Sequence, residues 1–258
     1  MRAPSVFVSH GAPDLALQRN AATEALAQFG RTIRAPRAVL VVSAHWMTRG
    51  IRVGGSAHPE TIHDFGGFPR ELFELRYPAP GDPALAARVA TLLGEASFAA
   101  EIDPERGLDH GAWVPLRLLF PEPSIPVVPI SIPAREPGAS LLAAGRALAP
   151  LREEGILLLG SGTIVHNLAT IAFGDDDATT PAWASSFDEW TWEAVRARDA
   201  AALLELDRRP EAPLAAPTPE HFVPLLFPLG ALAPEERVEP IHRGFMYGTL
   251  SMDAWTSA

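Results

Sequence analysis

Four strongly apolar runs, separated by stretches with helical periodicity, constrain the fold of this chain more than any other feature. The runs span residues 5–9, 38–44, 127–132 and 156–160, and the helical patterns span residues 15–30, 83–96, 141–154 and 183–207. Such runs are typical of strands that are buried on both faces of a sheet. Their alternation with helices predicts an α/β fold with a mostly parallel central sheet and helices on both faces.

The length and charge of the chain limit its organisation and its partners. A length of 258 residues suits one α/β domain, so we expect residues 1–258 to form a single catalytic domain. No apolar run approaches the roughly 18 residues of a membrane-spanning helix, and the first residues lack a signal-peptide pattern. We therefore expect no membrane association and a cytoplasmic location. The formal net charge of −10 argues against a nucleic-acid partner, because phosphate binding depends on clustered basic residues.

Two residue types are absent, and each absence excludes a class of chemistry. The chain has no Cys, which excludes disulfides, a thiol nucleophile and thiolate metal ligands. It also has no Lys, since all 21 basic residues are Arg, and this excludes a Schiff-base lysine and a P-loop. Any catalysis must therefore use His, carboxylates, hydroxyls or a metal that nitrogen and oxygen atoms bind.

Three of the predicted strands lead into a histidine. The segment VFVSH ends at His10, AVLVVSAH ends at His45, and ILLLGSGTIVH reaches His166 through a glycine-containing turn. In an open α/β sheet, ligand sites lie outside the carboxyl ends of the strands. We therefore expect these three imidazoles to meet at that edge of the sheet and to form a site there.

The remaining histidines lie in loops or near a late helix. His110 lies between two glycines in GLDHGAW, on a turn where the backbone can approach a ligand. His63 lies in TIHDFGGFP, a loop that resembles the aromatic wall of a pocket but could equally pack as an ordinary loop. His58 and His242 have no supporting context, so we predict that they are surface residues.

The segment APTPEHFVPLL predicts the start of a late helix. Thr218 would cap this helix and Pro219 would occupy its first position, which places Glu220 and His221 in the first turn. Adjacent helical residues point about 100° apart, so we expect only one of Glu220 and His221 to face a common metal ion.

Five motifs in this order resemble one enzyme family: SAHW, TIHDFGGFP, GLDHGAW, SGTIVHNL and PTPEHFVPLL. Together they resemble the class III extradiol ring-cleavage dioxygenases, and the nearest branch is the bacterial 4,5-DOPA dioxygenase type. The resemblance runs from SHGAP near the start to GTLSM near the end. It implies an enzyme that cleaves a catechol-type ring, with a DOPA-like substrate, and that uses O2 to form a muconic semialdehyde-type product.

The resemblance also implies roles for particular residues. It implies a non-haem Fe(II) bound by His10, His45 and a third ligand, for which we favour His221 and keep Glu220 as the alternative. His166 would be the general base and could also serve as a fourth ligand, and His110 would contact the substrate or bound oxygen. Zn2+ could replace iron in purified or crystallised protein, because zinc binds nitrogen sites more strongly than Fe(II) does.

The substrate contacts are less constrained. We predict that His63, Asp64 and Phe65 contact a small aromatic diol, and that O2 is the second substrate. Three arginines near these loops could pair with a substrate carboxylate or could be ordinary surface residues; they are Arg49, Arg70 and Arg76. Two other functions stay open, a zinc-dependent hydrolase on the same histidines and a non-catalytic interaction protein of the same fold. The oligomeric state is also open.

Overall fold

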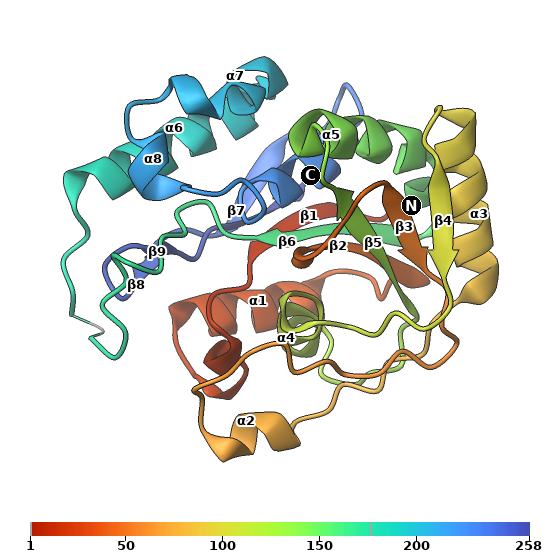
Figure 1. Cartoon of the computed structure of the whole chain (residues 1–258), viewed down its shortest axis with the longest axis horizontal. Coiled ribbons are helices and arrows are strands. Elements are labelled where there is room, and N and C mark those ends of the chain that lie inside the picture. The colour runs from red at the N-terminus through yellow and green to blue at the C-terminus, as the bar shows by residue number, and fades with distance from the viewer. Residues whose placement is uncertain (1, 176) are drawn as a thin grey trace.

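The computed structural model describes residues 2–175 and 177–258, and an eight-stranded sheet forms its centre (Figure 1). The strand order is β4-β3-β5-β2-β6-β1-β10-β7. The strands are β1 (Ser5–Ser9), β2 (Ala38–Thr48), β3 (Ile51–Gly54), β4 (Ala100–Asp103), β5 (Val127–Pro133), β6 (Ile156–Gly162), β7 (Val238–His242) and β10 (Ala254–Ser257). A separate two-stranded sheet pairs β8 (Phe245–Met246) with β9 (Leu250–Ser251).

The sheet is mixed but mostly parallel, as the alternation of strands and helices predicts. Strands β5, β2, β6 and β1 run parallel to their neighbours in the centre. On one side, β3 pairs antiparallel with β5 and parallel with β4; on the other, β10 and β7 add antiparallel strands. The four apolar runs are the four central strands, which are the ones buried on both faces.

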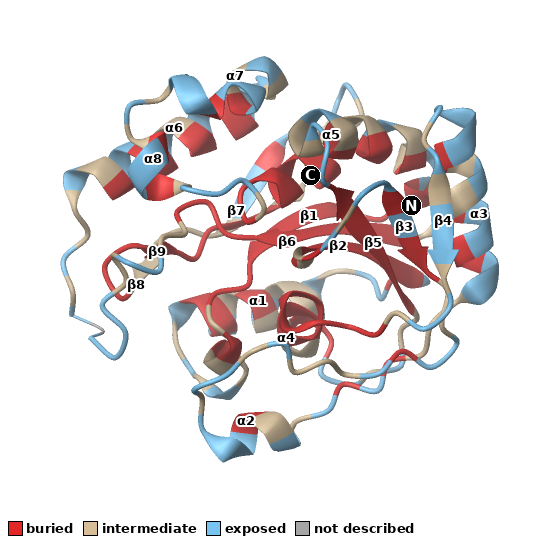
Figure 2. Ribbon diagram, viewed as in Figure 1, coloured by how far each residue is buried: buried red, intermediate tan, exposed pale blue. Residues whose placement is uncertain are grey.

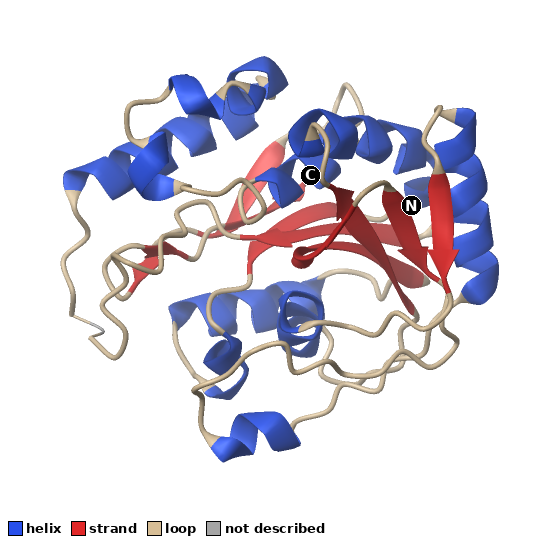
Figure 3. Ribbon diagram, in the orientation of Figure 1, coloured by secondary structure: helices blue, strands red, loops and turns tan. Residues whose placement is uncertain are grey.

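Successive residues of the central strands enter two different cores, one on each face of the sheet. Leu40 and Leu158 belong to one core, whereas Val41 and Leu159 belong to the other. Figure 2 shows the buried sheet between exposed helix surfaces, and Figure 3 shows helices both above and below it. The arrangement follows from the period of two in a strand, which sends neighbouring side chains to opposite faces.

Helices cover both faces of the sheet. The helices of one layer contribute to the core that contains Leu40; they are α3 (Pro83–Glu95), α5 (Pro137–Leu148), α6 (Ala182–Ala197), α7 (Ala200–Leu204), α8 (Ala212–Ala215) and α9 (Leu226–Gly230). The other layer contains α1 (Ala21–Thr32), α2 (Arg70–Glu74) and α4 (His110–Leu119). None of the described helices is both long and apolar enough to cross a membrane.

Three of the four predicted helices are interrupted. Asn20 caps α1 with a reciprocal bond to Thr23, so the predicted helix over residues 15–30 divides into the 3-10 turn η1 (Pro13–Leu17) and α1. Arg198 has a left-handed φ of 57°, which ends α6 before α7 begins. Residues 141–154 likewise divide into α5 and the 3-10 segment η2 (Ala149–Glu154). Helix α3 agrees with the predicted residues 83–96 within one residue.

The late helix begins later than the sequence predicts. Residues up to His221 form turns, Phe222 occupies the N-cap position, and the 3-10 segment η4 (Val223–Leu225) precedes α9. Thr218 is therefore not the cap, and Glu220 and His221 lie before the helix instead of in its first turn. Pro224 explains part of the difference, because it lacks the N–H that an α-helix would use to bond the carbonyl of Glu220. The carbonyl of His221 accepts from the backbone N–H of Thr163 instead.

The sequence predicts that His45 follows the end of its strand, but in the structure His45 lies within β2. Strand β2 continues to Thr48, although its pairing with β6 stops at Ser43. Its register with β5 is irregular between Val42 and Met47. His45 therefore lies where β2 separates from β6, and this separation leaves room for a side chain at the edge of the central sheet.

Candidate metal centre

Five histidines from separate segments line one cavity of about 260 Å3 at the carboxyl edge of the central strands. His10 follows β1, His45 lies in β2, and His110 is the first residue of α4. His166 follows β6 by four residues, and His221 precedes η4. The structure thus brings together all three histidines that follow strands, as predicted, and adds His110 and His221 to the same cavity.

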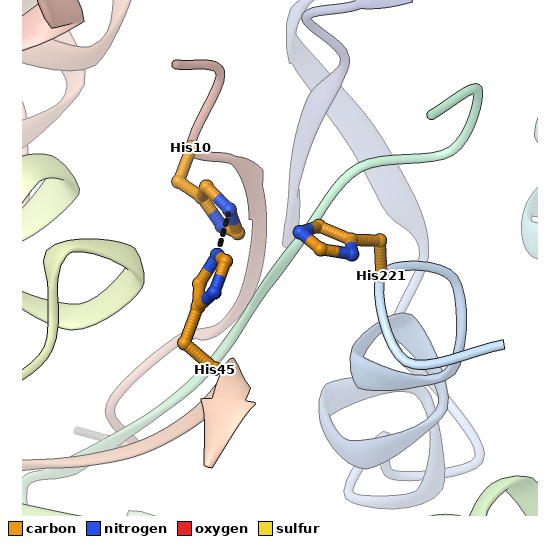
Figure 4. A group of neighbouring side chains, drawn as sticks. All are labelled: His10, His45 and His221. Carbon is orange, nitrogen blue, oxygen red and sulfur yellow. Dashed lines mark hydrogen bonds between the residues drawn. The ribbon is translucent and has the colours of Figure 1, made fainter. Parts of the chain in front are cut away.

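Among the described residues, His10, His45 and His221 form a tight group of possible metal ligands (Figure 4), and His45, Asp64 and His110 form a second one. One ring nitrogen from each lies within 4.8 Å of the others. The Nε2 atoms of His10 and His45 are 3.1 Å apart, and the ring centroid of His221 lies 5.4 Å from that of His10 and 4.9 Å from that of His45. Three imidazoles from distant parts of the sequence therefore point toward one small volume.

The tautomer of His10 follows from its hydrogen bonds. The Ser161 hydroxyl donates its single proton to the carbonyl oxygen of Gly111. The same hydroxyl oxygen lies 3.0 Å from Nδ1 of His10, so it must accept a proton from Nδ1. The Nε2 atom of His10 then carries a lone pair, which is the form that binds a metal ion.

His221 is oriented by the residue beside it. Its Nδ1 lies 3.1 Å from Oε1 of Glu220, and the Thr218 hydroxyl donates to the same carboxylate oxygen at 2.7 Å. These hydrogen bonds outweigh the effect of burial and lower the pKa of Glu220 to about 2, so the carboxylate is ionised and accepts the Nδ1 proton. The Nε2 atom of His221 is left with its lone pair. Glu220 is thus a partner of His221 and not a member of the tight ligand group.

Burial keeps the imidazoles of His10 and His45 neutral. His10 is almost completely buried, and burial together with the neighbouring His45 and His221 lowers its pKa well below the usual value. Burial, together with the nearby His110 and His221, lowers the pKa of His45 to about 2. Neutral imidazoles have the lone pairs that metal coordination requires.

The spacing of the nitrogens fits a transition-metal ion. Two nitrogens at about 2.1 Å from one ion are about 3.0 Å apart at a right angle and about 3.4 Å apart at a tetrahedral angle. The 3.1 Å between Nε2 of His10 and Nε2 of His45 lies within this range. An all-nitrogen donor set suits iron, zinc and related ions, whereas calcium and magnesium prefer oxygen.

His166 lies against the ligand group without belonging to it. Its ring stacks on that of His221, with centroids 3.6 Å apart and an angle of 9° between the planes. Burial and the adjacent His221 lower the pKa of His166 to about 3, against the opposing charge of Glu220. The ring is therefore neutral at physiological pH, lines the cavity, and can accept a proton.

His110 is held by Asp64. The backbone N–H of His110 donates to Oδ1 of Asp64 at 3.0 Å, and Nδ1 of the ring is also 3.0 Å from that oxygen. Burial raises the pKa of Asp64, but its interactions with His110 outweigh this effect and lower it to about 2. Asp64 also lies 3.8 Å from Nδ1 of His45. One carboxylate therefore faces two of the five histidines.

The aromatic loop contributes one wall of the cavity. Phe65 lines the cavity, and its ring meets that of His110 edge-on with centroids 5.7 Å apart. His63 does not line it: its Nε2 lies 3.1 Å from the carbonyl oxygen of Leu75, and its ring packs near Trp113. Asp64 is placed behind His110. The structure thus brings only Phe65 of the three predicted substrate contacts to the cavity surface.

The remaining polar candidates lie elsewhere. Arg49 lines a separate surface depression, Arg70 forms an exposed pair with Glu74, and Arg76 donates to backbone carbonyls. His58 is exposed, as predicted, whereas His242 is partly buried because it pairs with Ala254 in the outer sheet.

Sequence reasoning missed several contributors to the cavity. Ser161 and the role of Glu220 as a partner of His221 left no signal, because both depend on contacts between distant segments or on the conformation of a turn. Sequence reasoning also did not identify the other apolar residues of the wall. Some lie inside the recognised motifs and others outside them; they are Phe68, Leu168, Ile171, Phe173 and Leu250.

Comparisons with known proteins agree with this geometry. A family model described as the catalytic LigB subunit of aromatic ring-opening dioxygenase matches residues 3–252. The chain is 42% identical over 257 residues to the 4,5-DOPA dioxygenase extradiol of Escherichia coli (strain K12), with coverage of 97% of this chain and 93% of that protein. It is 37% identical to the protein of the same name from Beta vulgaris, with coverage of 96% and 94%. A crystal structure of an uncharacterized protein from Escherichia coli K12 matches with a TM-score of 0.85 and 36% identity, over 99% of both chains.

Proposed function

Since this chain belongs to the LigB family of aromatic ring-opening dioxygenases and is an extradiol ring-cleavage enzyme, we propose that it cleaves a catechol-type ring with O2. The bond that breaks lies beside the two hydroxyl-bearing carbons, and the product is of the muconic semialdehyde type. Both atoms of O2 enter this product, so the reaction needs no external reductant. The observation that carries the proposal is the convergence of His10, His45 and His221.

We assign the three converging imidazoles as ligands of a non-haem Fe(II). Ser161 and Glu220 hold the Nδ1 protons of His10 and His221, which leaves Nε2 of each ring available. Fe(II), when bound, would supply the electronic coupling between a closed-shell catechol and triplet O2. With three ligands from the protein, the ion keeps positions open for both substrates.

His166 is the general base of this proposal. A catechol must lose protons to bind a metal ion through both oxygens, and a neutral imidazole in the cavity can accept one. Burial lowers the pKa of His166 to about 3, so the ring is unprotonated but weakly basic. It would accept the proton of a catechol hydroxyl that a metal ion, when bound, makes more acidic. Its position against His221, outside the tight ligand group, supports this role over that of a fourth ligand.

His110 is the residue best placed to return a proton during ring opening. The carboxylate of Asp64 lies 3.0 Å from Nδ1 of His110, so a proton on that nitrogen would face an acidic oxygen. His110 also lines the cavity, so its ring can reach a hydroxyl of the substrate. Two histidines with different neighbours thus supply the base and the acid.

The proposal is tested by loading the protein anaerobically with Fe(II) or Zn2+ and then adding a catechol and oxygenated buffer. We expect one O2 consumed per catechol with the iron form, together with a new visible absorbance, and no O2 uptake with the zinc form. Product formation without O2 uptake would instead indicate a hydrolase.

A pair of histidine variants makes the test specific to the site. His45→Ala is expected to lose metal and activity, because it removes one of three ligands. His58→Ala is the matched control, since His58 is exposed and lies outside the cavity. Full turnover by His45→Ala would refute the assignment of this metal centre.

A further inference from the structure

The wall of the cavity around the histidines is almost entirely apolar. Apart from the five histidines, every residue that lines it is a glycine or carries a hydrocarbon side chain; these residues are Gly11, Ala12, Pro13, Phe65, Gly66, Phe68, Leu168, Ile171, Phe173 and Leu250. Among the described residues, no arginine, carboxylate or hydroxyl side chain belongs to this lining. The described part of the cavity wall therefore offers a substituent on the ring no polar side chain other than an imidazole.

The charges closest to the cavity would not help an anionic substituent. Asp64 and Glu220 do not line the cavity, and their carboxylate oxygens face ring nitrogens of His110 and His221. Arg106, which lies near the same end of the sheet, is paired with the buried Asp109 and stacks on Trp46. A carboxylate on the substrate would thus find no free guanidinium among these groups.

The mouth of the cavity is apolar as well. Leu168 and Phe173 are 65% and 54% exposed, although both line the cavity, so they form part of its rim. A catechol whose hydroxyls reach the metal centre directs its substituent away from that centre and against this apolar rim. The cavity volume of about 260 Å3 is below the range of about 300–1,000 Å3 that is usual for ligand pockets, which leaves little room for water around a charged group.

We propose that the preferred substrate is a catechol with a neutral, apolar substituent, and that amino-acid and carboxylate-bearing catechols are poorer substrates. This inference rests on the proposed ring-cleavage function and refines its substrate class. The physical reason is that a charge moved from water into an apolar cavity without a partner loses its hydration and gains no compensating interaction. The relatives named as 4,5-DOPA dioxygenases would then differ from this chain in substrate preference.

The test compares three catechols whose side chains all have three carbons. They are 4-propylcatechol, 3-(3,4-dihydroxyphenyl)propanoate and L-DOPA, which carry a neutral, an anionic and a zwitterionic substituent. We expect kcat/KM of the Fe(II) protein to be at least about 10-fold higher for 4-propylcatechol, equivalent to about 1.4 kcal/mol. Anaerobic binding of the same compounds, followed by protein fluorescence, should give Kd values in the same order.

A charge-introducing variant tests whether the rim sets this preference. Leu168→Arg places a guanidinium at the mouth and is expected to raise kcat/KM for the propanoate relative to 4-propylcatechol by about 10-fold. Leu204→Arg adds the same charge to an exposed leucine of α7, outside the cavity, and should leave the ratio unchanged.

The outcomes separate the two proposals. If L-DOPA is turned over as well as 4-propylcatechol or better, the substrate inference is wrong while ring cleavage stands. If none of the three compounds consumes O2, the proposed function fails and the substrate inference fails with it.

Discussion

At the scale of single residues, the hydroxyl proton of Ser161 decides which nitrogen of His10 can bind a metal. Ser161 donates to the carbonyl of Gly111, so it can only accept from Nδ1 of His10. Partners of this kind fix both the tautomer and the orientation of a ligand. Their loss typically lowers metal affinity by about 10- to 100-fold.

We predict that Ser161→Ala weakens metal binding by about that factor while the protein remains folded. A metal titration against a competing chelator measures the change. Ser5→Ala is the matched control, because Ser5 is equally buried and donates to the carbonyl of Pro228 but lies at the other end of the sheet. Equal metal affinities in the two variants would contradict the role of Ser161.

The contribution of His166 is separable from that of the ligands. His166→Gln removes the base but leaves His10, His45 and His221 in place, so iron content should stay near that of the unmodified protein. Turnover should fall by about 10²- to 10⁴-fold, which is the usual effect of losing a positioned general base. Iron analysis and catechol titration on one sample decide the matter, and near-complete loss of iron would make His166 a ligand instead.

At the scale of elements, the start of α4 lies unusually close to β2. A Cβ atom at Gly111 would approach Oγ of Ser43 to 2.4 Å and Cδ2 of His45 to 2.9 Å. The side chain of Asp109 caps α4 and accepts from the Ser43 hydroxyl, which holds the helix and the strand together. Gly111 therefore permits the contact that sets the distance between His110 and His45.

We predict that Gly111→Ala destabilises the protein by about 1–3 kcal/mol and lowers activity, because α4 must move away from β2. Gly94→Ala is the control: it lies in α3 with no atom within 4 Å of an added Cβ, and it should stabilise the protein by up to about 1 kcal/mol. Urea unfolding of both variants gives the comparison. A neutral effect of Gly111→Ala would show that the helix and strand are not in close contact.

At the scale of the whole molecule, one charged cluster joins α6 to the segments beside the outer antiparallel strands. Helix α6 belongs to the helix layer that packs on the core containing Leu40. Arg243 binds Asp188 and Glu189 from α6 and also binds Asp253. Two of these carboxylates are buried beside one guanidinium. Burial, together with the charge of Asp253, raises the pKa of Asp188 to about 7, against the opposing bonds from Ser251 and Arg243.

This cluster predicts a pH dependence of stability. The folded protein keeps the Asp188 proton up to about pH 7, whereas an unfolded chain releases it near pH 4, at the usual aspartate pKa of about 3.9. Between these values the folded state binds more protons, so the contribution of Asp188 to the unfolding free energy falls as pH rises.

The measurement is urea unfolding at about pH 5 and about pH 7.5. Most of the change in the contribution of Asp188 to the unfolding free energy falls between these two pH values. Asp188→Asn cannot ionise and should lose less stability between the two pH values than the unmodified protein does. Glu189→Gln is the control, because Glu189 binds the same arginine from an exposed position. Parallel pH profiles for the unmodified protein and Asp188→Asn would contradict the prediction.

The parts of this molecule that could be predicted from sequence are those fixed by local patterns. The four apolar runs predicted the four central strands. The positions of His10 and His45 at the ends of two of these runs predicted that both lie at one edge of the sheet. The late segment was placed wrongly, because the sequence of Thr218 and Pro219 resembles a helix start although the chain forms turns up to Phe222. Its local signals could not show that Glu220 would face Nδ1 of His221.

Contacts between distant segments were outside the reach of local patterns. The pairing of Asp64 with His110 depends on how a loop of more than ten residues folds over α4, and no periodicity specifies that path. The apolar rim depends in the same way on the segment that contains Leu168 and Phe173. The motif resemblance supplied the order of the histidines, but not these neighbours.

The position of β10 has a consequence for how a newly made chain matures. It is the last strand in the sequence, yet it lies between β1 and β7, with Val8 opposite Ala254 and Thr256 opposite Val6. Until the ribosome has translated β10, that edge of β1 lacks the partner it has in the folded protein. The group of His10, His45 and His221 likewise cannot assemble before His221 has been translated, although His10 and His45 come from the first strands of the chain. Prematurely terminated products would carry an open β1 edge, which marks them for aggregation or proteolysis.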